Sequence, residues 1–399
     1  MHQNIQNLVN VAAKQERMVI GLMSGTSMDG LDIALCSIKG SGMDTQFELK
    51  AFTTVDYTID FKEKILSIFS KEMVALETLC LLNAWVGKQH GKMVLDALAS
   101  WKIEPKNVDM IASHGQTIYH APKSLHPQSE YDPATLQIGD GDHIAVTTGI
   151  LTLSDFRQKH IAAGGEGAPL AVYGDYLLCS HPTENRLLLN MGGIANFTYL
   201  AAGCSLDQVF STDTGTGNTL MDAYTRTHFA PLAYDKDGAI AAAGKINAAL
   251  LFELKAHSFF SLVLPKTIGP ELFNLEFLAK AQKASYTEDL SKEDVMATLN
   301  RFSAETIADC IQSSIPAGTK FNMYSSGGGM HNPVLMGHLT SLLPNATLYS
   351  SDVIGINPDA KEAILFALLA NEAVAGTPLF AGGNATKIPI TMGKMSFPL

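Results

Sequence analysis

GLMSGTSMDGLD, Gly21–Asp32, places a turn rich in glycine and hydroxyl groups between two apolar segments. Met18–Ser24 and Asp32–Ile38 are predicted strands on either side of it. Glycine lets the backbone approach a phosphate closely, and successive N–H groups and hydroxyls can then converge on the anion. A plain type I′ hairpin turn is the alternative, but it would be shorter and would not need three hydroxyls. The segment therefore predicts a phosphate-binding turn in an ATP-dependent phosphotransferase.

A carboxylate just beyond such a turn can hold Mg²⁺ directly or through water. Asp29 and Asp32 are therefore the predicted magnesium ligands. The patterns GxxxxGK[ST] and GxSxG do not occur in the chain, which argues against a Walker A loop and against a serine hydrolase. The predicted ATP-binding residues of the turn are Gly25, Thr26, Ser27, Met28, Asp29, Gly30, Leu31 and Asp32.

Composition narrows the class of protein. The 399 residues carry a formal net charge of −11 and no basic tail, so neither nucleic acid nor an anionic membrane is an expected partner. The five cysteines are widely spaced without a CxxC pair, which is typical of reduced thiols in a cytoplasmic protein. Residues 1–17 lack the features of a secretory signal and are expected to be an extension or a short helix.

Strands and helices alternate along the chain, which indicates an α/β fold. Arg186–Asn190 and Ala195–Leu200 flank a second glycine turn, and this hairpin echoes the first at a distance of about 170 residues. The repetition predicts two lobes, residues 18–206 and 207–399. The last helix, Lys361–Ala375, can pack back on the first lobe.

Three loops of the second lobe are candidates for nucleotide chemistry. Gly192 and Gly193 would form a second phosphate turn, although Gly–Gly hairpin turns are common. Gly327–Gly329 and Asn332 would receive adenosine at the mouth of an open sheet, unless they form only a wide strand-to-helix turn. Asp213, in DTGTGN after an apolar strand, could be the general base of phosphoryl transfer or a helix-capping residue.

Polar residues at two strand ends of the first lobe are predicted to bind a sugar. They are His114, Gln116 and Thr117 in one segment, and Asp155 and Arg157 in the other. Ligands of α/β proteins bind at the ends of parallel strands. A buried core histidine at position 114 and a structural ion pair at Arg157 remain alternatives.

These segments together resemble the ASKHA superfamily of acetate and sugar kinases, Hsp70 and actin, and most closely the anhydro-N-acetylmuramic acid kinase family. The resemblance runs from about Met18 to Leu369 and rests on GLMSGTSMDGLD, SHGQTIYH, LQIGDG, SDFR, AAGGEGAPL, NMGGIANF, DTGTGN, PKTIG and SSGGGMHN. It implies a two-lobed actin-like ATPase or ribonuclease H-like fold with a central cleft. It also implies a cytoplasmic homodimeric kinase of peptidoglycan recycling that uses ATP, Mg²⁺ and water to convert 1,6-anhydro-N-acetylmuramic acid into N-acetylmuramic acid 6-phosphate.

The resemblance implies that Glu362, which matches a family carboxylate near the sugar, is a second catalytic residue in addition to Asp213. The chain departs from the family pattern at Glu166 and Thr216, where glutamine and proline are usual. Pro270 and Leu272 also stand where arginines are frequent. These departures concern substrate affinity and loop closure rather than Asp213 or the first turn.

Two other functions fit the same residues. One is an ASKHA kinase for an ordinary amino sugar or polyol hydroxyl, which would need no ring opening. The other is an actin-like or Hsp70-like ATPase that acts as a binding module, which should polymerise or bind peptides in response to nucleotide. The polar segments at His114 and Arg157 suit a small substrate better than a protein surface.

Overall fold

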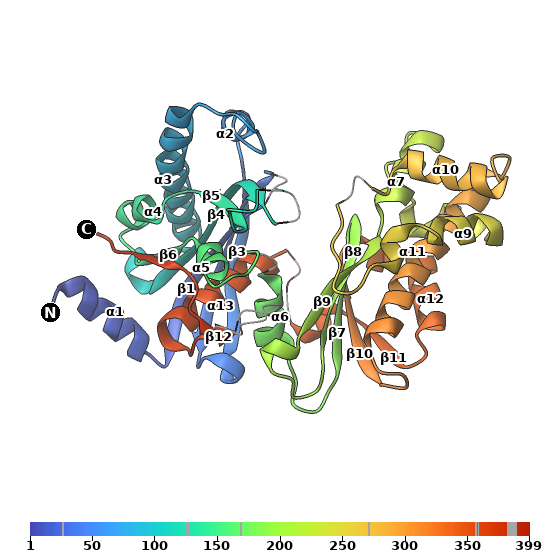
Figure 1. The fold of residues 1–399 in the computed structure, drawn as a ribbon. Helices are drawn as coiled ribbons and strands as arrows, with labels where there is room; N and C mark the ends of the chain where they lie inside the picture. The colour runs from blue at the N-terminus through green and yellow to red at the C-terminus, as the bar shows by residue number, and fades with distance from the viewer. Residues whose placement is uncertain are drawn as a thin grey trace. The chain divides into compact units, whose positions relative to one another are not determined.

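The computed structural model describes the whole chain except residues 26–27, 124–125, 127, 168–169, 270–271, 356, 358 and 381–388. The chain divides into two compact units (Figure 1). Unit 1 comprises Met1–Leu178, Ser205–Asp207 and Asp359–Leu399, and unit 2 comprises Cys179–Cys204 and residues 208–358. The sequence placed a single boundary near residue 206, whereas the chain here leaves unit 1 after Leu178 and returns to it at Asp359.

The sheet of unit 1 has the strand order β14-β6-β4-β1-β2-β3, and β5 pairs with the far part of β4. β1, β2 and β3 are antiparallel neighbours, while β4 is parallel to β1 and β6 is parallel to β4. The strands are β1 (Glu16–Ser24), β2 (Gly30–Lys39), β3 (Gln46–Asp56), β4 (Met110–Ala121), β5 (Ala134–Ile138), β6 (Thr152–Ser154) and β14 (Lys394–Ser396).

Helices cover both faces of this sheet. Ile20 and Leu22 of β1 pack in one apolar cluster with Val86 and Leu98 of α3, while Gly21 faces α13 because side chains alternate along a strand. A Cβ atom at Gly21 would lie 1.8 Å from the carbonyl oxygen of Ala363, so only glycine lets α13 lie this close to β1. The helices are α1 (Gln3–Ala13), α2 (Ile59–Leu66), α3 (Leu76–Trp101), α4 (Gly141–Thr148), α5 (Phe156–Ala162), α6 (Ala171–Cys179) and α13 (Lys361–Ala375).

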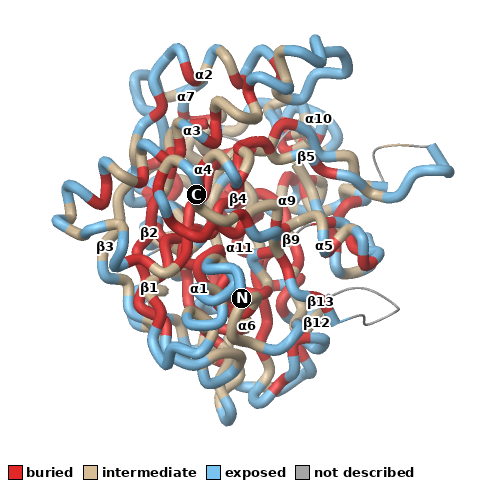
Figure 2. Tube along the Cα trace, turned by 90° about the vertical axis from the view of Figure 1, so that its left-hand side faces the viewer, coloured by how far each residue is buried: buried red, intermediate tan, exposed pale blue. Residues whose placement is uncertain are grey.

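Burial follows this layering. Figure 2 shows β1, β2 and β4 largely as buried chain, whereas α1 lies on the surface and has no buried residue. A two-stranded ribbon, β12 (Leu379–Phe380) and β13 (Pro389–Ile390), completes unit 1. Within the described ranges, no helix is both long enough and apolar enough to cross a membrane.

Unit 2 repeats the arrangement in its strand order β11-β10-β7-β8-β9. β7, β8 and β9 are antiparallel neighbours, β10 is parallel to β7 and β11 is parallel to β10. The elements are β7 (Arg186–Met191), β8 (Ile194–Leu200), β9 (Phe210–Thr216), β10 (Phe321–Ser326), β11 (Ala346–Ser350), α7 (Thr219–His228), α8 (Ala239–Ala243), α9 (Ala248–Lys255), α10 (Leu275–Ser285), α11 (Lys292–Ser314) and α12 (Pro333–Leu342).

The two sheets therefore share one topology, three antiparallel strands followed by two parallel ones. β1, β2, β3, β4 and β6 correspond in order to β7, β8, β9, β10 and β11. The predicted α/β class, the repeated hairpin and the ASKHA fold are confirmed.

Two strands extend further than the sequence indicated. His114, Gln116 and Thr117 were expected at the end of a strand, but β4 continues through them to Ala121. The continuation has hydrogen-bonded neighbours, because Gln116 pairs with Ser24 of β1 and with Ile138 of β5. β9 likewise continues to Thr216, so Asp213 lies inside a strand. The predicted strands ended too early because the prediction followed the polarity of the side chains. The backbones of these polar residues are still paired in the sheet.

Candidate active site

The first glycine turn joins β1 to β2 and is described at Gly25 and from Met28 onward; the predicted residues Thr26 and Ser27 lie outside the described part of the chain. Met28 has a positive φ of 56°, and its side chain and that of Leu31 are buried in the apolar cluster of unit 1. A Cβ atom at Gly30 would lie 2.6 Å from the carbonyl oxygen of Val55. The second half of the turn is thus held both by buried apolar side chains and by close contact with β3.

The two predicted metal ligands differ in environment. Asp29 is exposed, whereas Asp32 is half-buried and accepts a 2.6 Å hydrogen bond from Thr54 Oγ1. Burial raises the pKa of Asp32, the bond from Thr54 lowers it, and the nearby Asp359 raises it again. No group of three or more metal-ligating side chains occurs in the described ranges. Two carboxylates still fit Mg²⁺, which is usually held by one or two carboxylates together with substrate phosphates and water.

A buried chain of hydrogen bonds leads to the first turn. His90 Nε2 lies 2.9 Å from the Tyr57 hydroxyl, which donates to Ser24 Oγ at 2.7 Å. Ser24 Oγ donates to Gln116 Oε1 at 2.5 Å, and Gln116 Nε2 donates to the Gly25 carbonyl at 3.3 Å. The predicted sugar ligand Gln116 is therefore bonded to the phosphate turn by both ends of its amide.

His114 and Arg157 form a second buried pair in unit 1. Arg157 Nε donates to His114 Nε2 at 3.0 Å and a terminal guanidinium N–H donates to the Gly167 carbonyl at 2.7 Å. The His114 ring also packs on Phe366 of α13, with centroids 4.9 Å apart. Burial, and then the charge of Arg157, lowers the pKa of His114 to about 3. His114 is thus a neutral imidazole whose Nε2 accepts from the guanidinium.

Glu362 lies in the first turn of α13 and in the electrostatic field of the same residues. Partial desolvation of the carboxylate by neighbouring residues raises the pKa of Glu362, although the residue as a whole is exposed. Arg157 lowers that pKa and Asp32 raises it. Because α13 is fixed on β1, the structure brings Glu362, Arg157, His114 and Asp32 of the predicted site together within unit 1.

The other two predicted sugar ligands have structural partners. Thr117 Oγ1 accepts a 3.2 Å hydrogen bond from Gln137 Nε2. Asp155 precedes α5 with a positive φ of 58° and forms an ion pair with Lys394 of β14. Together with His114, it lines a pocket of about 600 Å³ in unit 1. Thr117 lies outside the set of residues that line this pocket.

In unit 2, the second glycine turn and the predicted adenosine loop meet. A Cβ atom at Gly327, where φ is 80°, would lie 2.7 Å from the Met191 carbonyl oxygen. Gly192 and Gly193 accept backbone hydrogen bonds from Asn218 at 2.9 Å and from Gly217 at 2.8 Å. Gly328 and Gly329 lie in the 3₁₀ turn Gly328–His331, and Asn332 follows directly before α12. The Asn332 Oδ1 atom caps α12 by accepting from the N–H groups of Val334 and Leu335, each at 3.1 Å.

Asp213 is held beside an irregularity in the sheet. Asn196 of β8 pairs with Asp213, but the preceding Ala195 pairs with Gly215, so Thr214 is an extra residue in β9. Asp213 Oδ2 accepts a 2.8 Å hydrogen bond from the Ile268 N–H. Burial raises the pKa of Asp213 and the bond from Ile268 lowers it. Asn218, not Asp213, is the N-cap residue of α7, so the helix-capping alternative for Asp213 is wrong.

Four residues near these groups were not singled out from the sequence: Tyr57, His90, Lys266 and Ile268. Tyr57, in the segment VDYTID, and His90, in the segment GKQHGK, belong to no motif that was singled out from the sequence. Lys266 and Ile268 belong to the PKTIG segment, which could have drawn attention to them as a motif near an expected base.

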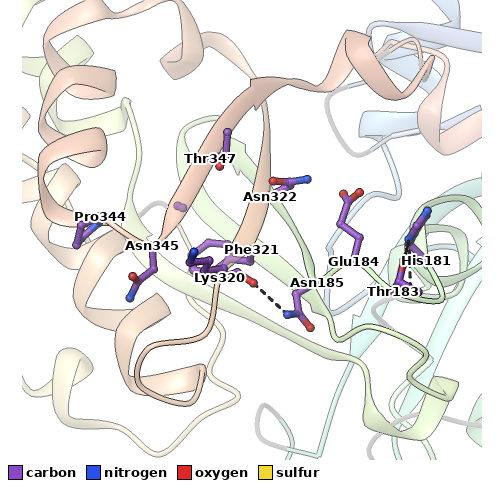
Figure 3. Close-up of a pocket in the computed structure, with 11 residues that line it drawn as sticks. His181, Thr183, Glu184, Asn185, Lys320, Phe321, Asn322, Pro344, Asn345 and Thr347 are labelled. Atoms are coloured by element: carbon purple, nitrogen blue, oxygen red, sulfur yellow. Dashed lines mark hydrogen bonds between the residues drawn. The ribbon is translucent and has the colours of Figure 1, made fainter.

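A larger pocket of about 780 Å³ lies elsewhere in unit 2 (Figure 3). It is lined by polar residues at the amino ends of β7, β10 and β11, including Glu184, Asn322 and Thr347. The glycine turns follow the carboxyl ends of β7 and β10. The pocket is therefore separate from the predicted nucleotide residues.

Comparison with known proteins gives the family. The model of the family described as anhydro-N-acetylmuramic acid kinase matches residues 17–392. The chain belongs to the anhydro-N-acetylmuramic acid kinase family. The resemblance carried by the motifs is thereby confirmed.

Proteins named anhydro-N-acetylmuramic acid kinase are similar to this chain along its length. That of Pseudoalteromonas atlantica is 58% identical, with 100% of each chain covered. That of Caldanaerobacter subterraneus subsp. tengcongensis is 38% identical, with 98% of this chain and 100% of that protein covered. A solved ROK family glucokinase of Streptomyces griseus, in complex with glucose and AMPPNP, covers 88% of this chain and 98% of its own, with a TM-score of 0.34 and 10% identity.

Proposed function

We propose that this chain is the ATP-dependent kinase that converts 1,6-anhydro-N-acetylmuramic acid and water into N-acetylmuramic acid 6-phosphate. The observation that carries the proposal is membership of the anhydro-N-acetylmuramic acid kinase family across residues 17–392. Peptidoglycan recycling, a cytoplasmic location and a homodimer belong to the same proposal, because the family resemblance implies them.

The substrate dictates the order of bond changes. Its O6 bridges to C1, so there is no free hydroxyl at C6 to phosphorylate. Asp213 takes a proton from water as the water oxygen bonds to C1, and the C1–O6 bond breaks. O6 then bonds to the γ-phosphorus, the bond from that phosphorus to ADP breaks, and Asp213 later releases its proton to solvent. A half-buried carboxylate with a raised pKa suits this general-base role.

Unit 1 supplies the expected sugar contacts. The half-buried guanidinium of Arg157 suits the lactyl carboxylate of the substrate, and its present bonds to His114 and Gly167 also anchor the loop that contains Gly167. Glu362 would orient the water or a sugar hydroxyl. Gln116, Thr117 and Asp155 would bind sugar polar groups beside neutral His114.

Each glycine turn is the proposed phosphate-binding segment of its own unit, and Gly327–Gly329 would bind the adenosine of ATP. Asp29 and Asp32 would hold a Mg²⁺ ion, which when bound offsets the charge of the phosphates. The backbone N–H groups of the turns contribute fixed partial positive charge toward the same anion.

The decisive test is the product made in ¹⁸O-water, analysed by mass spectrometry. The proposal predicts a phosphorylated muramic acid with ¹⁸O at C1 and none in the phosphate. The same product, incubated without enzyme in ¹⁸O-water for the same time, controls for exchange at the anomeric carbon. A phosphorylated product without label would contradict hydrolytic opening and favour the kinase for an ordinary hydroxyl. Nucleotide-dependent polymerisation without sugar turnover would favour the ATPase module.

Asp213→Asn tests the assigned base. The variant should bind an ATP analogue with wild-type affinity, because the amide leaves the glycine turns intact, and should lose turnover by several orders of magnitude because it cannot accept the proton. Isothermal titration calorimetry and an ADP-release assay measure the two quantities. Near wild-type turnover would remove Asp213 from the mechanism.

A further inference from the structure

Lys266 is a buried lysine in unit 2 that the reaction described above does not use. Its side chain is 7% exposed, and its ammonium donates to the carbonyl oxygen of Phe259 at 3.1 Å and lies 3.5 Å from that of Phe260. The ammonium also lies 4.4 Å from the centre of the Phe259 ring, within cation–π range. Across the described residues, no carboxylate forms an ion pair with it.

Burying an ammonium group without a counter-ion costs free energy of desolvation. Transfer of a charged group from water into an apolar environment is unfavourable unless the charge is paired or hydrogen-bonded, and burial lowers the pKa of Lys266 accordingly. A methionine of similar length would fill the same space without that cost. The two carbonyl oxygens and the ring therefore form a specific binding site for the ammonium. By binding it, they hold residues 266–268 in place.

That segment runs along the free edge of β9. The Asp213 N–H donates to the Lys266 carbonyl at 2.9 Å, and the Lys266 N–H donates to Thr212 Oγ1 at 3.0 Å. Two residues further on, the Ile268 N–H donates to Asp213 Oδ2 at 2.8 Å. The position of Ile268, and with it the orientation of the carboxylate, depends on how firmly residues 266–268 are held.

We propose that Lys266 is a positioning residue for the reaction: its ammonium ties residues 266–268 to the carbonyls of Phe259 and Phe260, and thereby keeps the Ile268 N–H on one oxygen of Asp213. The other oxygen is left to receive the proton of the attacking water. This inference rests on the proposed function in one respect, the role of Asp213 as the base.

The proposal predicts a change in the pH dependence of turnover. A hydrogen bond donated to a carboxylate favours the charged form, so losing the Ile268 bond raises the pKa of Asp213. A general base works only when it is deprotonated, and the acid limb of the kcat profile must then move to higher pH, by roughly one unit for one charge-assisted hydrogen bond.

Among the residues that the structure describes, few other groups near Asp213 can titrate. Cys310 of α11 is within electrostatic range of both Asp213 and Lys266, but burial raises the pKa of its thiol. The facing residues of β8, Ala195 and Asn196, carry no charge. The acid limb should therefore report mainly the Asp213 carboxyl.

The experiment compares kcat from pH 5 to 8.5 for the wild type, Lys266→Met and Lys266→Arg. On the acid limb, at pH values below the wild-type midpoint, Lys266→Met should lose up to about tenfold in kcat and recover at higher pH, with KM for both substrates within twofold of the wild type. Lys266→Arg keeps a cation, so the acid limb of its kcat profile should lie close to that of the wild type. Lys255→Met is the matched control, because it removes a lysine that is ion-paired with Glu305 and Asp309, and its acid limb should coincide with the wild type.

An acid limb that does not move in Lys266→Met, or a loss of kcat that is equal at every pH, overturns the proposal. If Lys266→Met does not fold, Lys266→Gln keeps an N–H donor without the charge. It should shift the limb in the same direction by a smaller amount, and no shift overturns the proposal as well.

Failure of the proposed function is distinguishable from failure of this inference. Wild-type enzyme that does not turn over the anhydro-sugar rejects the function, and the inference is then read from the pKa of Asp213 itself. Carboxyl ¹³C resonances of labelled aspartate, assigned with Asp213→Asn, give that pKa in the wild type and in Lys266→Met. A higher pKa in Lys266→Met supports the inference, and an equal pKa overturns it.

Discussion

Replacing Tyr57 by phenylalanine should destabilise unit 1, because it leaves one buried hydrogen-bond donor without an acceptor. Gln116 Nε2 donates to Gly25, so Gln116 Oε1 is an acceptor and Ser24 must donate to it. The Ser24 hydroxyl has one proton, and the Tyr57 hydroxyl therefore donates to Ser24. The bond between Tyr57 and His90 must then be donated by His90 Nε2–H. Burial lowers the pKa of His90 to about 4, so the ring is neutral near pH 7.

The expected magnitude follows from this directional chain. Tyr57→Phe leaves Ser24 its bond to Gln116 but leaves His90 Nε2–H without an acceptor in a site where His90 is 0% exposed. An unsatisfied buried donor costs about 1–3 kcal/mol, so the free energy of unfolding of unit 1 should fall by about 2 kcal/mol. Replacing both partners by apolar groups is nearly neutral in comparison. In Tyr57→Phe/His90→Leu, the loss should therefore be smaller than the sum of the single losses by about 1 kcal/mol or more.

The chain provides its own probe for this measurement. Its two tryptophans, Trp85 and Trp101, both lie in α3 and pack against the apolar cluster of unit 1. Urea unfolding followed by tryptophan fluorescence therefore reports on unit 1 alone. Tyr324→Phe is the matched control, because it removes a hydroxyl that donates to Glu184 in unit 2 at 2.8 Å, and its fluorescence transition should coincide with the wild type. A wild-type transition for Tyr57→Phe, or additive losses in the double variant, would refute the deduced direction of the chain.

The same probe tests two further expectations. Gly21→Ala should lower the free energy of unfolding of unit 1 by about 3 kcal/mol or more, because the new Cβ would lie 1.8 Å from the Ala363 carbonyl oxygen. Gly337→Ala, with nothing within 4 Å of its Cβ position, is the control, and an unchanged transition for Gly21→Ala would contradict the close packing. Unit 1 should also lose stability as the pH falls from about 6.5 to about 4, because burial lowers the native pKa of His90 to about 4 and that of His114 to about 3, whereas the unfolded chain protonates near 6.5. His90→Leu should have the shallower pH dependence, and an equal slope would show that His90 is not buried as a neutral ring.

The fold was largely predictable because the informative signals are local. A glycine turn between two apolar runs, repeated about 170 residues later, indicated two related sheets, and α13 was predicted with the bounds Lys361–Ala375 that it has. Strand ends were less predictable, because the pairing of Gln116 with two neighbouring strands depends on residues far along the chain. From the sequence, the last helix can pack back on the first lobe, but no local signal marks Asp359 as the residue at which the chain returns to unit 1.

The site was predictable by residue type and less so by arrangement. The charge of Arg157 acts on both of the other predicted residues, His114 and Glu362. Nothing in the spacing of the residues indicated that Arg157 would donate to His114 or that Gln116 would bind the first turn. Such bonds depend on the register of strands rather than on the spacing of residues, so Tyr57, His90 and Lys266 emerged only from the structure.

The position of α13 has a consequence for co-translational folding on the ribosome. Ala363, Phe366 and Ala367 are buried in a helix that covers one face of β1, yet about 180 residues of unit 2 are translated between Leu178 and that helix. At roughly 5–20 residues per second, the sheet of unit 1 waits on the order of 10 to 40 s after the synthesis of Leu178 for this cover. Unit 2, although it begins second, is the first to have its whole sequence available. A nascent chain that stops before residue 359 leaves an uncovered apolar sheet face, which is where chaperones would be needed.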